Sequence, residues 1–294
     1  MVSSVKPEWL KRSAPDPVVL ARMKGLMDGL HLHTVCESAH CPNSGECFAR
    51  GVATFMILGD VCTRNCTFCV VEHGQPVLPD ANEPEHVVEA VKKLGLRHVV
   101  ITSVTRDDLP DGGAYQFAKV VEAIRSHNSR ISIEVLIPDF QGSLSALGIV
   151  VVSHPSVINH NVETVPRLYS QVRPQADYER SLQLLGHVKS MGGGLFTKSG
   201  LMVGLGERRG EVIRVMEDLR GVDCDLLTIG QYLRPSPDHH DVVRFVSPAE
   251  FKEYEDAGMA MGFKGVASAP LVRSSFQADK MLKGIAHPRD DVGG

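Results

Sequence analysis

Six of the seven cysteines in this chain lie between Cys36 and Cys69, in two sets of three. The second set has the spacing CxxxCxxC and consists of Cys62, Cys66 and Cys69. The first set has the spacing CxxxxCxxxxxC and consists of Cys36, Cys41 and Cys47. Thiolates are the usual ligands of iron–sulfur clusters, and a cubane cluster has four irons. Three protein thiolates leave one iron open, and an open iron can bind a small molecule and do chemistry.

Zinc is the main alternative for these cysteines. Structural zinc usually has a closed set of four nitrogen or sulfur ligands. Neither triplet has a fourth cysteine nearby, although His40 or His73 could serve. The remaining cysteine, Cys224, begins an apolar segment and is predicted to be a core thiol.

The bulk composition limits the classes of partner. The chain has 294 residues, 43% of them hydrophobic, which is enough for a full core. A formal net charge of −4 argues against nucleic acid and anionic membranes as partners. No apolar run approaches the ~20 residues of a membrane span. The cysteine number is odd and the first residues lack the apolar stretch of an export signal, so we expect a reducing, cytoplasmic location.

From residue 53 onward, apolar strands alternate with helical patterns. The expected strands are 53–58, 97–104, 131–137, 156–160, 199–204, 225–230 and 264–268. Helical spacing of apolar residues follows at 82–95, 114–125, 182–188, 212–219 and 249–261, whereas residues 1–50 have little regular pattern. Strands that are apolar on both faces and alternate with helices indicate a parallel sheet covered by helices.

The number of these units favours a full or partial (β/α) barrel of the TIM type. No GxGxxG follows the first strand, which weakens a dinucleotide-binding alternative. Chemistry in such barrels takes place at the carboxyl ends of the strands. The CxxxCxxC motif comes just after the first strand, so we expect it on that rim.

Residues 59–69, GDVCTRNCTFC, resemble the cluster loop of radical S-adenosylmethionine (SAM) enzymes. The preceding cysteine triplet is similar to the auxiliary-cluster motif of the lipoyl synthase family. Further stretches that resemble this family are 101–114, 134–142, 159–169, 172–182, 197–207, 230–240 (GQYLRPSPDHH) and 271–276 (LVRSSF). The resemblance covers roughly residues 36–280.

This resemblance implies an α/β fold of the radical SAM type with three parts. These are an N-terminal extension with auxiliary-cluster ligands (1–50), the barrel (51–269) and a C-terminal segment (270–294). Cys62, Cys66 and Cys69 would hold a 4Fe–4S cluster that binds SAM and cleaves it to a 5′-deoxyadenosyl radical. Cys36, Cys41 and Cys47 would hold a second 4Fe–4S cluster, the sulfur source, with Ser275 as its labile fourth ligand. Phe276 stands where the family usually has tyrosine.

The implied reaction inserts two sulfurs, at C6 and C8 of an octanoyl chain attached to a lysine. The implied partners are an octanoylated lipoyl-carrier protein or domain, an electron donor such as flavodoxin or ferredoxin, and an iron–sulfur cluster carrier. Two alternatives remain open. One is another two-cluster radical SAM enzyme, such as a methylthiotransferase. The other is a non-enzymatic iron–sulfur or zinc-binding module.

The resemblance also indicates polar groups that would contact SAM. They follow the second and fourth strands and are Thr102, Arg106, Asp107, Gly112, Gly113, Asn161, Glu163 and Arg173, with Asp108 alongside. Loop capping and surface ion pairs are the alternative for each of them. Lys198 could reach a carboxylate or be solvated. His239 and His240 are expected to be surface histidines rather than a metal-binding pair.

Overall fold

The fold is built around one curved sheet. The computed structural model describes residues 6–11, 16–35, 43, 47, 54–192, 194–275 and 278–286. The strands follow each other across the sheet in chain order: β1 (His33–Thr34), β2 (Thr54–Ile57), β3 (His98–Ser103), β4 (Ser132–Leu136), β5 (Val157–Asn159), β6 (Phe196–Val203), β7 (Leu226–Gln231) and β8 (Gly265–Ser268). Strand β1 pairs antiparallel with β2, and β2 to β8 pair in parallel. The predicted parallel sheet is therefore confirmed.

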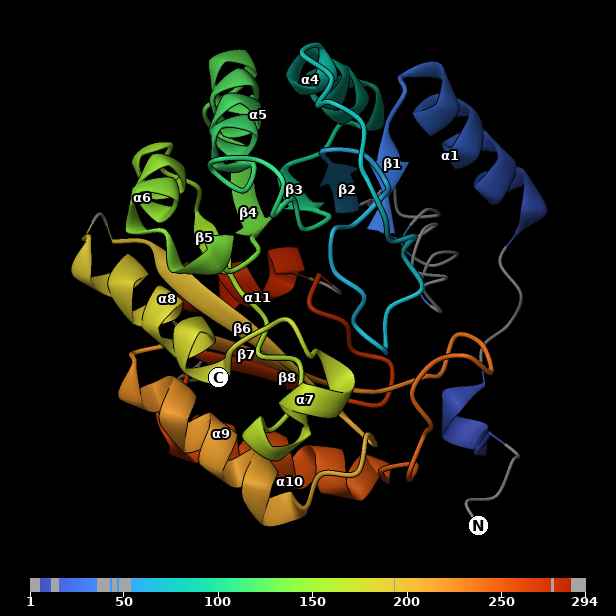
Figure 1. The fold of residues 1–294 in the computed structure, drawn as a ribbon, viewed down its shortest axis with the longest axis vertical. Helices are drawn as coiled ribbons and strands as arrows, with labels where there is room; N and C mark the ends of the chain where they lie inside the picture. Colours follow the sequence, from blue (N-terminus) through green and yellow to red (C-terminus); the bar gives the residue numbers. More distant parts are fainter. Residues whose placement is uncertain are drawn as a thin grey trace, which may run out of the picture.

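Helices cover the outer side of the curved sheet, and each crosses over between parallel strands (Figure 1). They are α4 (Glu83–Leu94), α5 (Ala114–His127), α6 (Leu144–Val152), α8 (Tyr178–Ser190), α9 (Arg209–Gly221) and α10 (Pro248–Ala260). Short turns and end segments complete the described elements: η1 (Glu8–Leu10), α1 (Pro17–Gly29), η2 (Phe140–Gly142), η3 (Pro166–Leu168), α7 (Tyr169–Val172) and α11 (Ala278–Ala286). Helix α11 contacts both β8 and β3.

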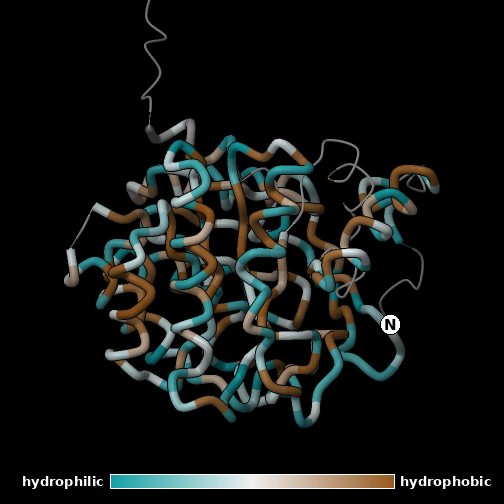
Figure 2. The backbone as a smooth tube through the Cα atoms, turned by 90° about the horizontal axis from the view of Figure 1, so that it is seen from above, coloured by the Kyte–Doolittle hydropathy of each residue, from teal (hydrophilic) through white to brown (hydrophobic). Residues whose placement is uncertain are grey.

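Helix α5 illustrates how the sequence pattern produces this arrangement. Phe117, Val120, Val121 and Ile124 recur with helical spacing, and all four have no exposed surface. They share one hydrophobic core with Ile101 of β3, which is also fully buried. Figure 2 shows hydrophobic segments running through the interior of the fold.

Helices α1, α6, α7 and α11 lie outside the expected helical segments, and α1 and α6 show why. Residues 1–50 have little regular pattern in the sequence, yet they contain α1, which begins after Asp16. The Asp16 carboxylate accepts a hydrogen bond from the Val18 amide at 2.8 Å. Helix α6 was not expected because its sequence, LSALGIVVV, is apolar all around and has no single stripe. Ser143 caps it by accepting a hydrogen bond from the Ala146 amide.

Two glycines allow close approaches at the carboxyl end of the barrel. Gly113 precedes α5 with φ +90°, and a Cβ atom there would lie 2.2 Å from Leu58 Cδ1. Gly230 in β7 lies against the C-terminal segment, where a Cβ atom would be 2.1 Å from the Val272 carbonyl oxygen. Gln231, next in β7, donates its amide to the Pro270 carbonyl at 3.2 Å. The segment that leads to Ser275 is therefore packed directly on β7.

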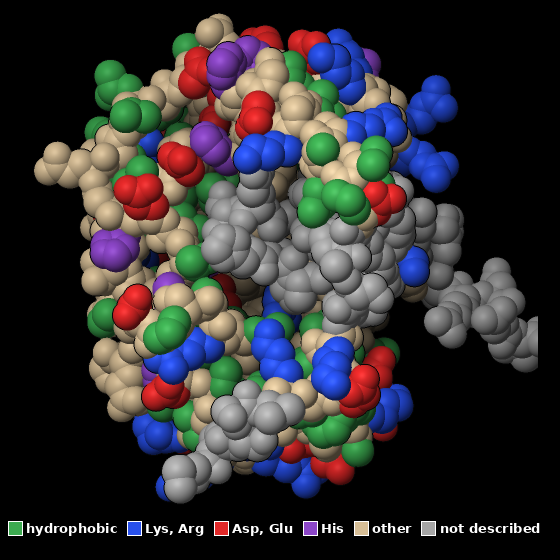
Figure 3. Space-filling view, turned by 90° about the vertical axis from the view of Figure 1, so that its right-hand side faces the viewer, with side chains coloured by type: hydrophobic (Ala, Val, Ile, Leu, Met, Phe, Trp, Pro, Cys, Tyr) green, Lys and Arg blue, Asp and Glu red, His purple; other side chains and the backbone are tan. Residues whose placement is uncertain are grey.

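The surface in Figure 3 carries acidic and basic side chains interspersed with one another, in keeping with the formal net charge of −4. Within the described ranges, no helix combines the length and the apolar character that a bilayer span requires.

Candidate active site

The CxxxCxxC motif lies in the loop that follows β2, residues 58–74, which we call the cluster loop. The Cys62 amide donates to the Glu72 carbonyl at 2.7 Å, and the Gly74 amide donates to the Cys62 carbonyl at 2.9 Å. The Cys69 amide donates to the Cys66 carbonyl at 3.0 Å, which forms a turn between these two residues. All three cysteines are half-buried free thiols. The loop thus presents its sulfurs at the carboxyl end of the barrel, as predicted.

The surroundings of the thiols differ. Cys62 Sγ accepts hydrogen bonds from the amides of Arg64 at 3.4 Å and Thr105 at 3.3 Å. Burial raises the pKa of the Cys69 thiol to about 12. Burial also raises the pKa of Cys66, while the positive charge of Arg173 opposes that rise.

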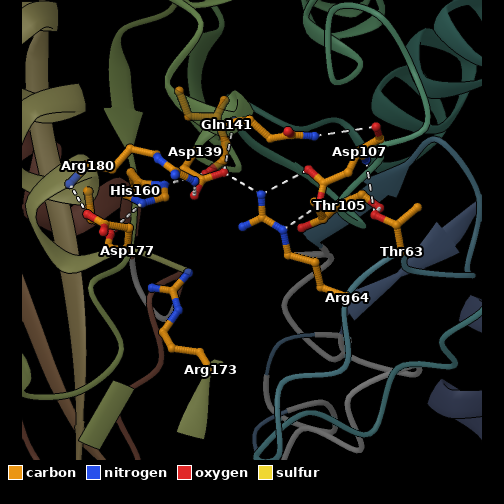
Figure 4. A network of polar contacts seen from close by, with 12 residues as sticks. Thr63, Arg64, Thr105, Asp107, Asp139, Gln141, His160, Arg173, Asp177 and Arg180 are labelled. Atoms are coloured by element: carbon orange, nitrogen blue, oxygen red, sulfur yellow. Dashed lines mark hydrogen bonds and ion pairs between the residues drawn. The ribbon is translucent and has the colours of Figure 1, made fainter. Parts of the chain in front are cut away.

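Arg64 fixes the cluster loop to the barrel through a set of charges that is buried at Arg64 and Asp139. We call Arg64, Asp107, Asp139 and Arg180 the Arg64 network (Figure 4). The Arg64 guanidinium donates to Asp107 at 2.6 and 2.9 Å and to Asp139 at 2.7 Å. Arg180 donates to the other oxygen of Asp139 at 3.2 Å. Because Asp107 follows β3 and Asp139 follows β4, one side chain of the cluster loop ties together the ends of two strands.

Asp139 is the most buried acid of this network, with no exposed side-chain surface. Burial alone would raise its pKa, but the hydrogen bonds and the charge of Arg64 outweigh burial and hold the pKa at about 2. The Gln141 amide also donates to it, at 3.1 Å. Asp139 is therefore ionised at neutral pH.

Three of the predicted SAM contacts come together beside the cluster loop. The Arg173 guanidinium donates to the Asn161 carbonyl at 2.8 Å, and the Asn161 side-chain amide donates to Glu163 at 3.0 Å. Burial raises the pKa of Glu163, and Arg173 opposes the rise. The Thr67 amide, next to Cys66, donates to the Val172 carbonyl at 2.9 Å, so Arg173 follows a residue that is bonded to the cluster loop. Glu163 adopts φ +62°, an uncommon value for a residue other than glycine.

The other predicted SAM contacts make bonds within the protein. The Thr102 hydroxyl donates to the Leu136 carbonyl at 2.9 Å. Arg106 is buried and binds the Asp108 carboxylate and the Leu58 carbonyl. Asp107 binds Arg64, as described above. Gly112, at φ +60°, and Gly113 form the turn before α5, where a Cβ atom on Gly112 would lie 2.9 Å from Phe140.

The first cysteine triplet is described in part. Cys36 and Cys41 lie outside the described residues, as do His40 and Phe276. Cys47 and Ser275 are both half-buried. The side chain of Asn43, which is 2% exposed, donates to the Leu271 carbonyl at 2.7 Å. The Asn43 carbonyl in turn accepts from the Cys47 amide at 2.9 Å, so this bond pair joins the first triplet to the C-terminal segment.

The remaining candidates are placed as follows. Lys198 is fully buried and reaches the Glu134 carboxylate at 2.9 and 3.1 Å, so it is not solvated. His73 is exposed and pairs with Cys62 through its backbone. Cys224 is fully buried, which confirms the core thiol. His239 and His240 are half-buried and bonded to neighbouring loops, rather than on the open surface.

Arg64, Asp139 and Asn43 were missing from the predicted site. Arg64 lies inside the cysteine motif, and Asp139 follows the carboxyl end of β4, the position at which barrels carry functional residues. These two signals were available in the sequence. The pairing of Asn43 with Leu271 had no local signal.

Comparison with known proteins identifies the class of this protein. Residues 56–219 match the Radical SAM superfamily. Among solved structures, HydG, a maturase of the FeFe-hydrogenase, has a TM-score of 0.57 at 17% identity, over 71% of this chain and 48% of that chain. Streptococcus suis SuiB bound to S-adenosylmethionine has a TM-score of 0.53 at 12% identity, over 73% of this chain and 50% of that chain. These two structures have the same fold as this chain. The match to the superfamily over residues 56–219 shows that the chain is a radical SAM protein.

Its sequence relatives define the family more narrowly. Lipoyl synthase from Caldanaerobacter subterraneus subsp. tengcongensis is 59% identical over 275 residues, 93% of this chain and 96% of the relative. Lipoyl synthase from Yersinia enterocolitica is 55% identical, over 95% of this chain and 88% of the relative. The chain belongs to the lipoyl synthase family. It is therefore a radical SAM sulfurtransferase whose cofactors are SAM and two 4Fe–4S clusters, which confirms the predicted fold class and cofactors.

The residues present fit these cofactors. Asn161 Oδ1 and Arg173 Nε are buried and have no hydrogen-bond partner within the protein, although buried polar atoms normally have one. An amide oxygen can accept from an amino group, and a guanidinium N–H can donate to a carboxylate, and SAM carries both groups. In the described part of the chain, no three His, Cys, Asp or Glu side chains converge on one metal ion. A cubane requires no such convergence because each cysteine binds a different iron.

Proposed function

We propose that Cys62, Cys66 and Cys69 hold the 4Fe–4S cluster that binds SAM. Three free thiols in one loop, next to the unpaired atoms of Asn161 and Arg173, are the observation that carries this assignment. When bound, the cluster and SAM together supply a carbon radical able to remove hydrogen from unactivated C–H bonds. The chain's own residues position these groups and exclude water from them.

Arg173, Glu163 and Asn161 are proposed to bind the methionyl end of SAM. Arg173 is the donor for the carboxylate, since a guanidinium binds carboxylates at fixed geometry. Glu163 and the Asn161 side-chain oxygen are the acceptors for the amino group. Thr102, Arg106, Asp107, Gly112 and Gly113 are proposed to shape the SAM pocket from the β3 side. The bonds that Thr102, Arg106 and Asp107 make within the protein support this role in shaping the pocket.

Cys36, Cys41 and Cys47 are proposed to hold the second 4Fe–4S cluster, with Ser275 as its fourth ligand. This assigns residues 1–50 and 270–294 to extensions of the barrel, 51–269. The bond from Asn43 to Leu271 supports the proposal because it brings residues of the first triplet and of the C-terminal segment into contact. A serine oxygen is a harder ligand than a thiolate and holds iron less firmly, which suits a cluster that gives up sulfur.

The proposed reaction adds sulfur at C6 and C8 of an octanoyl chain carried on a lysine of a lipoyl-carrier protein or domain. An electron donor such as flavodoxin or ferredoxin and an iron–sulfur cluster carrier are the further proposed partners, in the cytoplasm. The chain must place two successive C–H bonds against the same radical source, which requires an ordered channel for the substrate.

Anaerobically reconstituted protein incubated with SAM, a reductant and an octanoyl-lysyl peptide tests this function. We expect the peptide to gain two sulfurs by mass. Deoxyadenosine without sulfur transfer, or transfer of a methylthio group, would point to another radical SAM activity. A complete lack of SAM cleavage would favour a carrier protein.

Two variants test the ligand assignments separately. Cys69→Ala should abolish SAM cleavage and keep the auxiliary cluster. Ser275→Cys should keep both clusters and SAM cleavage but block sulfur transfer, because a thiolate holds the iron more tightly. Normal sulfur insertion by the Ser275→Cys enzyme would remove Ser275 from the proposal.

A further inference from the structure

The connection between β7 and α10, residues 232–247, reaches the cluster loop, and we call it the histidine loop. It contains most of the GQYLRPSPDHH stretch, which has no role in the proposed function above. His239 Nε2 lies 3.1 Å from the Cys69 carbonyl oxygen. The His240 amide donates to the Thr67 carbonyl at 2.9 Å. Two neighbouring residues of one loop therefore bind the main chain on both sides of Phe68.

The contacts of His239 define its tautomer. A carbonyl oxygen can only accept, so Nε2 must carry a proton to bond the Cys69 carbonyl. The other ring nitrogen, Nδ1, lies 2.8 Å from the Ser236 hydroxyl. In the neutral imidazole that nitrogen is an acceptor, so Ser236 donates to it. Both ring nitrogens are thus engaged, and the ring is held in one orientation.

The histidine loop is itself anchored to the barrel. The Tyr232 side chain, which is 2% exposed, donates its hydroxyl to the His240 carbonyl at 2.7 Å. His240 Nε2 lies 3.0 Å from the Leu205 carbonyl, after β6. Arg234 Nε donates to the His239 carbonyl at 2.9 Å. These bonds give the histidines a fixed base from which to hold the cluster loop.

We propose that His239 is a positioning residue for Cys69 and that Ser236 sets the tautomer that makes it a donor. This inference rests on the proposed role of Cys69 as a cluster ligand. The Cys69 amide is already bonded to the Cys66 carbonyl, so the His239 bond fixes the other end of the Cys69 main chain. The Cys69 sulfur then keeps only the rotation of its side chain. Groups behind a metal ligand typically contribute 10- to 100-fold to metal affinity or activity.

The test uses the full-length holoenzyme with His239→Phe, His239→Gln and Ser236→Ala. Phenylalanine keeps the ring without a donor, and glutamine keeps a donor without the ring. His187→Phe, at a half-buried histidine on α8, is the matched control. The readout is the rate at which an iron chelator removes the SAM-responsive cluster. The amount of this cluster is measured by the part of the EPR signal that changes when SAM is added.

We expect the His239→Phe enzyme to lose this cluster about 10- to 100-fold faster than the wild-type enzyme. The His239→Gln enzyme should be close to wild type, the Ser236→Ala enzyme intermediate and the His187→Phe enzyme unchanged. In the apoprotein, the rate at which iodoacetamide alkylates Cys69, measured on the isolated peptide, should differ from the wild-type rate most in His239→Phe, less in Ser236→Ala and least in the other two variants. This second readout needs no cluster and no turnover.

Two outcomes would overturn the inference in different ways. If His239→Phe is folded and both rates stay within twofold of wild type, His239 does not position Cys69. If Cys69→Ala keeps the SAM-responsive EPR signal, the ligand assignment fails first and the inference fails with it. Loss of that signal in Cys69→Ala, together with a normal His239→Phe enzyme, would refute the positioning role alone.

Discussion

Replacing Arg64 with methionine should destabilise the apoprotein through Asp139 more than through Asp107. Arg64 makes three hydrogen bonds to these two carboxylates. Asp107 has a side chain that is 28% exposed, so water can replace Arg64 there, whereas the Asp139 side chain has no exposed surface. Asp139 would keep Arg180 and the Gln141 amide but would lose its closest cation. Removing one partner of a buried ion pair costs about 3–5 kcal/mol, and we expect a loss at the lower end of this range.

Urea denaturation of the apoprotein under reducing, anaerobic conditions measures this loss as a change in the free energy of unfolding. The matched control is Arg167→Met. Arg167 binds Glu211 at 2.8 and 2.9 Å, but its side chain is 48% exposed. An exposed pair contributes about 1 kcal/mol at most. Equal losses in the two variants would refute the argument from burial.

A double variant tests the same reasoning. Arg64→Met combined with Asp139→Asn leaves no unpaired buried charge, so its loss should be smaller than the sum of the two single losses. A coupling energy of about 1–3 kcal/mol is expected for residues in one network. Strict additivity would mean that the Arg64 network does not act as a unit.

Three further predictions concern the pH dependence of Asp139 and two glycines. The Asp139 carboxylate has a pKa of about 2, below its unfolded value of about 4, so it contributes stability above pH 4 that is lost as the pH falls toward 2. In urea, the free energy of unfolding of the wild-type protein should therefore exceed that of Asp139→Asn by about 2 kcal/mol at pH 7, and this difference should shrink below pH 4. A difference that does not change with pH would contradict the assignment. In the same assay, Gly113→Ala should lower the free energy of unfolding by about 2–4 kcal/mol, because it combines a left-handed backbone with steric overlap. Gly95→Ala, at φ +61° in open space, should lower it by about 1 kcal/mol. Gly230→Ala should push the segment around Val272 off β7. The iron content should then fall from about eight toward about four atoms per chain, while the SAM-responsive EPR signal persists. An unchanged iron content would show that the segment tolerates the shift.

The sheet could be predicted from the sequence because its strands are buried on both faces. Such strands read as short, continuous apolar runs, and those that end in Ile57, Leu136 and Gln231 were recognised from this property. Helix α6 is apolar in the same way, so periodicity could not distinguish it from a strand or a core segment. Helix α1 lies outside the barrel repeat, and its cap at Asp16 was its main local signal.

The cysteine motifs could be recognised because the proposed ligands of one cluster lie close together in the sequence. The groups that hold those ligands in place come from distant parts of the chain. Asp139 is 75 residues from Arg64, and His239 is 170 residues from Cys69. A polar residue after a strand can cap a loop, bind solvent or form such a bond, and one sequence does not distinguish these possibilities. The fold had to be known before these partners could be assigned.

The bond between Asn43 and Leu271 also bears on when this protein can mature. It spans 228 positions, with almost the entire barrel between its two ends. A nascent polypeptide on the ribosome has no residue 271 until the barrel has been translated, so the bond cannot close while the barrel is being synthesised. By contrast, the three cysteines of the loop after β2 lie within eight residues of one another. The surroundings of the proposed auxiliary cluster are therefore completed only after the barrel has been synthesised.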